Sequence, residues 1–287
     1  MFKIMTDSMS DLPSGFIRQE NIDVLFVPYK IEGRIFNRNY QMDPVAFYNK
    51  MREGFVPETF PVTFEEARTA FGQVLKTQPE ILYISFSSKM SQTFENVQRA
   101  ARELNRGVDG AKIIVIDTKA ASLGQGLIVY QAARMRKEGA TIDEVAKYIE
   151  QNLQSFSQIM TVDSPGYLYR GNRIKKSSLI MCTLTGLRPI LHIDAEGAYA
   201  RFDLIRGRKS SLLYLVDFLE AHMKYSREDN EIIGISHCDC EADAEFVAEE
   251  IRRRFGFERI MIQMMEPAIG AHTGPGTIGL FFRGNKR

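Results

Sequence analysis

The amino-acid sequence predicts an α/β protein made of two parts. We expect an N-terminal three-layer α/β domain with a mainly parallel sheet over residues 1–160, and a C-terminal mixed-sheet α/β domain over residues 161–287. In the first half, short apolar runs alternate with amphipathic segments, as in parallel sheets covered on both faces. In the second half a hairpin signal breaks this rhythm, which favours a mixed sheet. With 287 residues, 44% of them hydrophobic, the chain is long enough for two cores.

The first half contains four predicted strands and five predicted helices. The strands are short apolar runs at residues 2–5, 24–27, 81–85 and 113–116. Three helices begin at recognisable caps: Asp43 before a proline, and the capping boxes that start at Thr63 and Thr141. Two further helices follow from apolar residues at helical spacing, over about 94–104 and over 123–136.

The second half predicts shorter elements. Two helical segments, near 165–170 and 176–184, precede a strand at 189–193, a turn at Asp194–Gly197 and a strand at 198–205, which together make a hairpin. A helix at 211–224, a strand at 231–236, a helix at 242–255 and a strand at 259–264 follow. We expect these helices to pack mostly on one face of the sheet.

A glycine-rich run near the C-terminus is the most informative segment. Residues 269–279 contain four glycines, one proline and a central His272, and the apolar residues 280–282 follow. This composition predicts a loop that ends in a strand, because glycine and proline disfavour regular structure. Such a loop either makes an ordinary turn or brings backbone and the histidine close to a ligand.

A hydroxyl-rich loop joins the strand at 81–85 to the next helix. Residues 87–93 contain three serines and one threonine, but a single lysine and no arginine. At the carboxyl end of a parallel strand, these hydroxyls and the free N–H groups of the helix could hold an anion, although capping the helix would explain one of them. The absence of a phosphate-loop pattern argues against a nucleotide. Because the loop has one lysine and no arginine, a carboxylate fits better than a phosphate, which usually recruits a guanidinium group.

Other polar groups favour structural interpretations. Asp7 and Asp11 follow the first strand, where a turn and a helix cap are favoured over a metal site, which would lack a third ligand. The segment from His237 to Cys240 is interpreted as a turn at the end of a strand, since four zinc ligands are not available nearby. We therefore predict no metal and no cofactor.

Charge and cysteine content limit the partners and the compartment. The net charge of +1 gives no field that would attract nucleic acid or an anionic membrane. Three cysteines without framework spacing are typical of free thiols in a reducing compartment. The N-terminus lacks the apolar core of a signal peptide, and no stretch approaches the ~18 apolar residues of a membrane span. These features predict a soluble, cytoplasmic protein without stable membrane insertion.

The chain resembles the DegV family of bacterial lipid-binding proteins over essentially its full length. Six segments in the same order carry the resemblance: Thr6-Asp7-Ser8-x-x-Asp11-Leu12-Pro13, Ser87-Ser88-Lys89-x-Ser91-x-Thr93, Asp117-Thr118-x-x-Ala121-Ser122-x-Gly124-x-Gly126, Leu168-x-x-Gly171-x-Arg173-Ile174, Arg206-Gly207-Arg208-Lys209, and residues 269–279. The resemblance implies a long-chain fatty acid between the two domains. It also implies a separate kinase that converts the presented carboxylate into an acyl phosphate for phospholipid synthesis.

The resemblance also implies which side chains take part. The carboxyl group would be surrounded by serine, threonine and histidine side chains, and the neighbouring polar residues complete the predicted ligand-binding set: Thr59, Ser91, Gln92, Thr93, His272 and Thr273. Arg206 and Arg208 would contact the kinase partner or the incoming phosphates. No residue is assigned a catalytic role, and the chain is expected to be a binding subunit and not itself an enzyme.

Two segments depart from the family pattern. Family members resemble Thr-Ser-Gln-Pro-Ser where this chain has Thr59-Phe60-Pro61-Val62-Thr63, and Gln92 stands where glycine is usual. Because Phe60 cannot hydrogen-bond a carboxylate, one contact is either missing or supplied by Gln92. Two alternatives stay open: an enzyme acting on a small acid, with His272 and Ser91 or Thr93 as base and nucleophile, or a regulatory module that binds another small anion.

Overall fold

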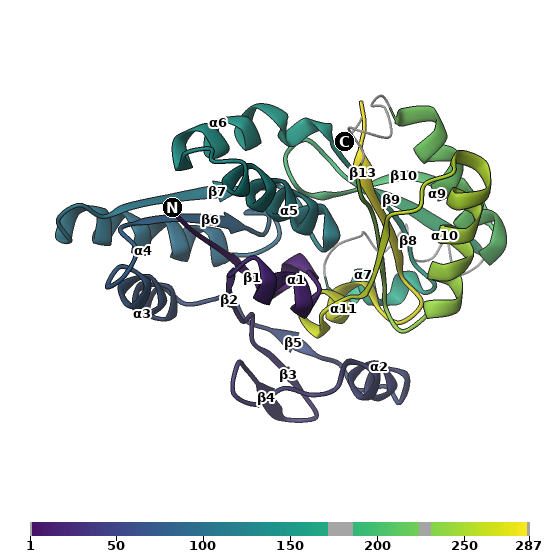
Figure 1. The fold of residues 1–287 in the computed structure, drawn as a ribbon. Helices are drawn as coiled ribbons and strands as arrows, with labels where there is room; N and C mark the ends of the chain where they lie inside the picture. Colours follow the sequence, from purple (N-terminus) through teal and green to yellow (C-terminus); the bar gives the residue numbers. More distant parts are fainter. Residues whose placement is uncertain (1, 172–185, 224–230, 286–287) are drawn as a thin grey trace.

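The structure is a computed structural model that describes residues 2–171, 186–223 and 231–285. These residues form a four-stranded sheet, a six-stranded sheet and a small three-stranded sheet, with helices between and around them (Figure 1). The four-stranded sheet is parallel and the six-stranded sheet is mixed. The predicted fold class, a parallel α/β part followed by a mixed-sheet part, is therefore confirmed.

The parallel sheet is the middle of three layers. Its strands lie in the order β2-β1-β6-β7, with bounds β1 Lys3–Asp7, β2 Asp23–Leu25, β6 Glu80–Ser85 and β7 Lys112–Asp117. Helices α3 (Phe64–Val74) and α4 (Thr93–Gly107) cover one face, and α5 (Leu123–Lys137) and α6 (Ile142–Asn152) cover the other. Alternate strand residues serve the two faces: Met5 packs toward α3 and α4, whereas Ile4 packs toward α5 and α6.

The mixed sheet has the strand order β10-β9-β8-β13-β11-β12, in which only β11 and β12 run parallel. Its strands are β8 Phe156–Thr161, β9 Leu187–Ile193, β10 Tyr199–Arg206, β11 Ile233–His237, β12 Ile260–Met264 and β13 Ile278–Arg283. Helices α9 (Arg208–His222) and α10 (Glu241–Phe255) pack on one face in a single apolar cluster.

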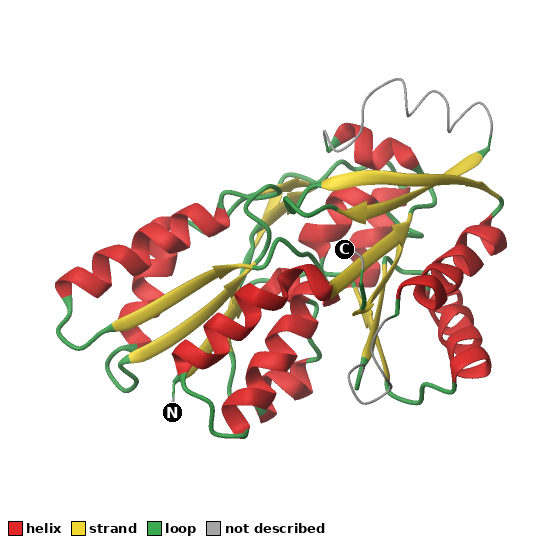
Figure 2. Ribbon diagram, turned by 90° about the horizontal axis from the view of Figure 1, so that it is seen from above, coloured by secondary structure: helices red, strands yellow, loops and turns green. Residues whose placement is uncertain are grey.

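Helix α5 joins the two larger sheets. It packs against β1 and β6 of the parallel sheet and against β8, β11 and β13 of the mixed sheet. Seen from above, helices lie alongside the strands of both sheets (Figure 2). Eleven of its 15 residues are buried, which a helix covered on several sides requires. The two sheets therefore meet through a shared layer of helix, and the division of the chain at residue 160 stays a prediction.

A small lobe projects from the parallel part (Figure 1). It consists of β3 (Tyr29–Ile31), β4 (Arg34–Phe36), β5 (Glu58–Thr59) and helix α2 (Pro44–Arg52), with aromatic contacts at its centre. The sequence did not predict these strands, because runs of two or three residues are too short to show a period of two. The lobe places Thr59 opposite the C-terminal part of the chain.

The predicted helix caps are confirmed. The Asp43 carboxylate accepts a hydrogen bond from Ala46 N at 2.9 Å, and both capping boxes are complete. The hairpin is confirmed as the antiparallel pair β9–β10, and the predicted strands agree with the observed ones within two residues. Helix α9 begins at Arg208, three residues before the expected start. The helix expected at 176–184 lies outside the described residues.

Strand β8 and several short elements were not predicted. Ser157 and Gln158 give β8 a polar appearance, yet both are buried, and Gln158 Oε1 accepts a hydrogen bond from Ala121 N at 3.1 Å. The helical segment predicted near 165–170 is confirmed as α7 (Pro165–Arg170), and the helix expected after Asp11 is α1 (Ser14–Gln19). The short elements that were not predicted are η1 Ser8–Ser10, η2 Leu153–Ser155 and α11 Pro267–Thr273.

The expectation of a loop through residues 269–279 is wrong for its first half. Residues Pro267–Thr273 form helix α11, and only residues 274–277 form a loop before β13. A Cβ atom at Gly270 would lie 2.2 Å from Tyr48 Oη, so glycine lets the helix approach this ring closely. Tertiary packing offsets the cost of about 1 kcal/mol that glycine brings to a helix.

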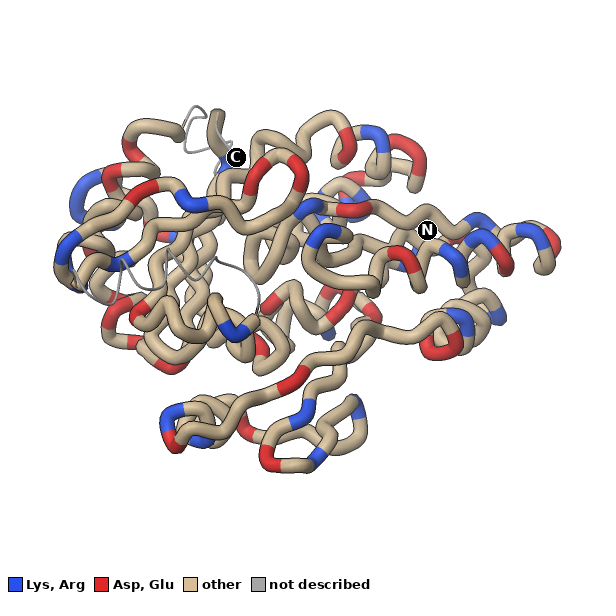
Figure 3. Tube along the Cα trace, turned by 180° about the vertical axis from the view of Figure 1, so that it is seen from behind, with Lys and Arg blue, Asp and Glu red and all other residues tan. Residues whose placement is uncertain are grey.

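The surface carries mixed charge. Lysine and arginine positions are interspersed with aspartate and glutamate positions along the trace (Figure 3), and the two signs nearly balance to a net charge of +1. In the described ranges, no helix is both long and apolar enough to cross a membrane.

Candidate functional site

A cavity of about 200 Å³ lies where the lobe, the parallel sheet and the C-terminal part meet. Most of its lining is apolar and comes from distant segments: Met9, Val27, Phe60, Pro61, Phe86, Met90, Tyr199 and Ile269. Four polar residues complete the wall, namely Thr59, Ser91, Gln92 and His272. The structure thus brings together four of the six predicted ligand-binding residues in one mainly apolar cavity.

Thr59 and His272 form the polar centre of this wall. Thr59 Oγ1 lies 3.0 Å from His272 Nε2, and either atom can donate according to the imidazole tautomer. Thr59 is held by the pairing of β5 with Tyr29 in β3, and His272 lies in the last turn of α11. Both residues are half-buried, so their polar atoms can reach a ligand in the cavity.

Ser91 and Thr93 are coupled at the start of α4. The two hydroxyl oxygens lie 2.9 Å apart, and Thr93 N donates to Ser91 Oγ at 3.2 Å. Thr93 is buried, does not line the cavity, and accepts a hydrogen bond from Val62 N at 3.1 Å. The structure therefore places Ser91 at the cavity wall and Thr93 behind it, where Thr93 ties the start of α4 to the chain beyond the lobe.

Gln92 and Phe60 stand at the exposed edge of the cavity. Gln92 is exposed at the N-cap of α4 and does not cap the helix with its side chain. Among the residues that the structure describes, the Gln92 amide has no hydrogen-bond partner. Phe60 is 37% exposed and contributes its ring to the wall. The Gln92 side-chain amide can therefore donate a hydrogen bond to a carboxylate at this edge of the cavity, where the Phe60 ring has no donor.

The other two serines of the hydroxyl-rich loop have structural partners. Ser87 Oγ donates to Gly197 O at 2.7 Å, across to the turn between β9 and β10. Ser88 Oγ donates to Asp117 Oδ2 at 2.6 Å, and Ser88 N donates to the second oxygen of the same carboxylate at 3.1 Å. These two hydroxyls hold the loop in place, so Ser91 is the one serine of the loop that lines the cavity.

The surroundings of His272 require small residues. A Cβ atom at Gly171 would lie 2.9 Å from His272 Nδ1, so only glycine leaves the ring its present space. Gly274, directly after α11, has a φ of 84° and packs against the ring of Tyr167. Thr273 is buried and lies away from the cavity lining, with Oγ1 3.5 Å from Cys238 Sγ. The structure does not bring Thr273 into the polar group around His272.

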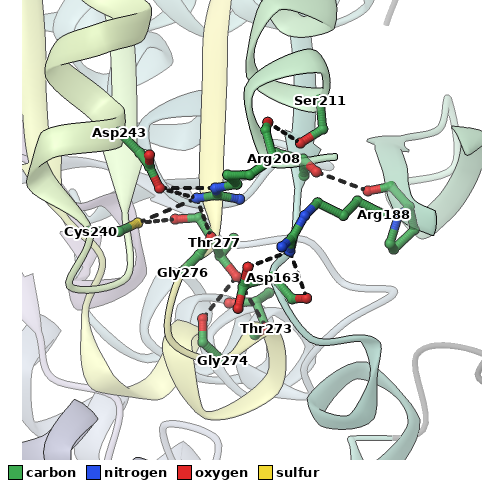
Figure 4. Close-up of polar contacts among 12 residues, drawn as sticks. Asp163, Arg188, Arg208, Ser211, Cys240, Asp243, Thr273, Gly274, Gly276 and Thr277 are labelled. Atoms are coloured by element: carbon green, nitrogen blue, oxygen red, sulfur yellow. Dashed lines mark hydrogen bonds and ion pairs between the residues drawn. The ribbon is translucent and has the colours of Figure 1, made fainter. Parts of the chain in front are cut away.

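The two arginines predicted to contact a partner differ in environment. Arg206 is exposed at the end of β10. Arg208 instead folds onto the protein: Nη2 lies 2.7 Å from Asp243 Oδ2 and donates to Gly276 O at 2.7 Å (Figure 4). This pairing also explains how a cation is accommodated in the first turn of α9, where it opposes the helix dipole.

The acidic residues after β1 are buried in hydrogen-bond networks. Asp7 caps η1 through Met9 N at 3.2 Å and accepts from Phe86 N at 3.0 Å, whereas Asp11 accepts from Ser122 Oγ and, at 2.8 Å, from Glu266 N. Burial raises the pKa of Asp7 to about 6, that of Glu266 to about 7 and that of Asp11 well above its ordinary value.

The histidine–cysteine segment forms the predicted turn. Strand β11 ends at His237, α10 begins at Glu241, and Cys240 N donates to His237 Nδ1 at 3.3 Å. Within the described ranges, no three histidine, cysteine, aspartate or glutamate side chains gather as a metal site would require.

Several lining residues were not identified from the sequence. Met9, Phe86 and Ile269 have the appearance of ordinary core residues, and Tyr199 follows a turn that is distant from all three in the chain. Only the arrangement of the elements assigns them to the cavity. The position of Tyr199 at the beginning of β10 is the one local signal, since loop-adjacent strand ends often reach binding sites.

Comparison with known proteins identifies the family. The family model described as "Uncharacterised protein, DegV family" matches residues 1–285. The chain belongs to the DegV family. A DegV domain-containing protein of Clostridium perfringens is 38% identical over 288 residues, which cover 100% of this chain and 98% of the relative. The resemblance found in the six sequence motifs is thereby confirmed.

Solved DegV structures share the fold. A DegV family protein from Thermus thermophilus, described as binding fatty acid, is 25% identical with a TM-score of 0.87, covering 99% of both chains. A protein from Thermotoga maritima, whose structure is described as revealing fatty acid binding function, is 27% identical with a TM-score of 0.81, again covering 99% of both chains.

Proposed function

We propose that this DegV protein binds a fatty acid in the cavity, with the carboxylate against Thr59, Ser91 and His272. The observation that supports it best is the convergence of these three side chains, from β5, the loop before α4 and α11, on one mainly apolar cavity. The two solved relatives at 25% and 27% identity that are described as binding fatty acids support the same ligand class.

The chemistry of the wall suits a carboxylate. The Ser91 and Thr59 hydroxyls and an imidazole N–H can all donate, and the exposed Gln92 amide adds donors at the edge. Each hydrogen bond to a charged acceptor is worth about 1.5–3 kcal/mol. The head group would be oriented by several such bonds, so the loss of one hydroxyl through Phe60 need not prevent binding.

The tail would provide most of the affinity. Burial of an alkyl chain gains about 0.8 kcal/mol per CH₂, or roughly 11 kcal/mol for about fourteen methylenes before entropy costs. The cavity volume of about 200 Å³ lies below the ~300–1,000 Å³ of most small-molecule sites. A long-chain acid therefore requires the cavity to widen when it binds.

Native mass spectrometry of the purified protein tests this proposal. We expect about one long-chain acid per chain, released on denaturation and identified by lipid analysis. Delipidated protein should regain thermal stability when palmitate or oleate is added, since a ligand that binds only the folded state stabilises it. Recovery of no lipid together with no thermal shift for either acid would refute the proposal.

We further propose that a partner kinase uses the bound acid. In this scheme a carboxylate oxygen attacks the γ-phosphorus of a nucleoside triphosphate, the bond to the β-phosphate oxygen breaks, and acyl phosphate and nucleoside diphosphate result. The chain itself would be the binding subunit, working in the bacterial cytoplasm for phospholipid synthesis. Arg206 would contact the partner or the phosphates, and the exposure of its side chain supports this role. Arg206→Ala should keep acid binding and slow acyl-phosphate formation by the cognate kinase, and unchanged phosphorylation would remove this role.

An enzyme acting on small acyl compounds is the second candidate. The 3.0 Å separation of Thr59 Oγ1 and His272 Nε2 falls within the range for a nucleophile and its base. A covalent acyl group on Thr59, detected by intact mass after incubation with p-nitrophenyl butyrate, would support that candidate. Native mass unchanged by the ester, together with a co-purified free acid, would favour the binding protein.

A further inference from the structure

Arg208 links three separate elements at the side of the mixed sheet. It is the first residue of α9, its Nε and Nη2 atoms lie 2.9 and 2.7 Å from Asp243 Oδ2 in the first turn of α10, and Nη2 also donates to Gly276 O at 2.7 Å (Figure 4). One guanidinium therefore anchors the glycine-containing loop, residues 274–277, to both helices.

The same loop determines how α11 ends. Thr277 Oγ1 donates to Thr273 O at 3.1 Å and to Gly274 O at 2.8 Å, which satisfies carbonyls at the end of the helix. Gly276 N donates to Cys238 O at 2.8 Å, and Cys238 N donates to Thr277 O at 2.9 Å. The loop is thus tied to the end of β11 on one side and to the last turn of α11 on the other.

A second arginine supports the loop from the opposite side. Arg188 in β9 forms an ion pair with Asp163 and donates to Asp163 O at 2.9 Å (Figure 4). A Cβ atom at Gly276, which has a φ of 80°, would lie 2.6 Å from Asp163 Cβ. The loop therefore lies between two ion pairs, Arg208–Asp243 and Arg188–Asp163. Gly276 is the loop residue that comes close to Asp163.

We propose that Arg208 is a positioning residue for His272. His272 lies in the last turn of α11, so its ring is fixed by Thr59 from the lobe and, through Thr277 and Gly276, by Arg208 from the C-terminal part. Removing the guanidinium leaves Gly276 O without this donor and Asp243 without its counter-ion, which frees the loop and the helix end. The inference rests on the proposed binding of a fatty acid at His272.

Two variants interrupt the link at different atoms. Arg208→Ala removes the guanidinium, whereas Asp243→Asn keeps the guanidinium and its positive charge and removes the carboxylate that orients it. Arg201→Ala, at an exposed arginine in β10, is the matched control for the loss of one positive charge. Palmitate and its alcohol, hexadecanol, are titrated into delipidated protein, and circular dichroism melting confirms that each variant is folded.

Both Arg208→Ala and Asp243→Asn should weaken palmitate binding by about tenfold, the value of one hydrogen bond to a charged acceptor. Hexadecanol binding should fall by about threefold or less, since only the acid needs an aligned donor. Arg201→Ala should match the wild type. Three results would each overturn the inference. They are wild-type affinity for palmitate in Asp243→Asn or Arg208→Ala, a loss of affinity in Arg208→Ala alone, and equal losses for the acid and the alcohol.

The ring resonances of His272 in the ligand-free protein provide a readout that does not depend on binding. Histidine-labelled protein has four imidazole signals, and His272→Ala assigns one of them. Arg208→Ala and Asp243→Asn should shift or broaden the His272 signal, whereas Arg201→Ala should not. If the wild type binds no acid but these shifts occur, the proposed function fails and the positioning role stands; unchanged signals would refute the role.

Discussion

Thr59 Oγ1 and His272 Nε2 lie 3.0 Å apart although 213 residues separate them in the chain. Thr59 belongs to the lobe beside the parallel sheet, and His272 to a helix that precedes the last strand of the mixed sheet. The pair therefore connects the two halves of the protein at the cavity wall. Its geometry depends on how these halves are packed against each other.

His272→Ala should weaken acid binding more than alcohol binding. The imidazole donates to a charged acceptor in the acid but to a neutral one in the alcohol, so palmitate should lose about 10- to 100-fold in affinity and hexadecanol clearly less. Calorimetric titration of delipidated protein measures both. His222→Ala is the control, because His222 does not line the cavity and contacts Asn285. Equal losses for the two ligands would mean that His272 shapes the helix end and does not recognise the carboxylate.

Thr59→Val should act through the same pair. Valine keeps the shape of threonine and removes the hydroxyl, so the imidazole loses one partner and the carboxylate one donor. We expect the effects of Thr59→Val and His272→Ala on palmitate binding to be non-additive by about 0.5–3 kcal/mol, as for residues in contact. Thr69→Val, at an exposed threonine of α3, is the control and should leave palmitate binding unchanged. If the effects of Thr59→Val and His272→Ala on palmitate binding add strictly, the two side chains act independently on the carboxylate.

Gly171→Ala should displace His272 by steric contact alone. The φ of Gly171 is −74°, which alanine adopts freely, yet its Cβ would lie 2.9 Å from His272 Nδ1. Palmitate affinity should fall about tenfold, the value of one misaligned hydrogen bond to a charged group. Gly72→Ala in α3, where a Cβ meets nothing within 4 Å, is the matched control and should stabilise the fold by up to about 1 kcal/mol. Undiminished binding in Gly171→Ala would show that the ring has room to move.

Glu266→Gln should change the pH dependence of stability. Burial raises the pKa of Glu266 from 4.5 to about 7 in the folded state, so the folded protein holds a proton that the unfolded chain releases near pH 4.5. Its contribution to the free energy of unfolding is therefore present at low pH and is lost as the pH rises from about 4.5 to 7. Urea unfolding between pH 5 and 8 measures this contribution. Relative to the wild type, Glu266→Gln should raise the free energy of unfolding by about 1–3 kcal/mol at pH 8 and by little at pH 5.

The other buried acids set the background for that measurement. The pKa of Asp7 is raised to about 6 and that of Asp11 is also raised, so part of the fall in stability with rising pH remains in Glu266→Gln. Asp11 keeps its hydrogen bond from the backbone N–H of residue 266 in this variant. If the free energy of unfolding falls by the same amount between pH 5 and 8 in Glu266→Gln and in the wild type, Glu266 is already ionised in the folded protein at neutral pH.

The fold was largely predictable where local chemistry selects the structure. Asp43, Thr63 and Thr141 cap helices because the hydrogen bonds involved span only three residues. The lobe was not predictable, since its strands are too short to show a pattern and its aromatic centre forms only after the chain folds back. Strand β8 was missed because buried Ser157 and Gln158 resemble surface residues in sequence.

The candidate site was predictable in its residue types and not in its geometry. The motif resemblance nominated Thr59, Ser91, Gln92 and His272, which the structure places on one cavity wall, but it also nominated Thr273, whose hydroxyl faces Cys238 in the interior. The motif resemblance assigned Arg208 to a partner contact and did not predict its ion pair with Asp243, because nothing in the chain between these two residues indicates that α9 and α10 bring them together.

The sequence by itself determined the α/β class, the starts of the capped helices, the hairpin and the family, because these depend on short-range periodicity, caps and motif order. Only the tertiary structure decided that residues 267–273 form a helix despite their glycines, that Thr59 meets His272, and that Arg208 anchors the loop after that helix. The physical reason is that these three features consist of contacts between residues far apart in the chain, whose free energy exists only once the sheets and helices are packed.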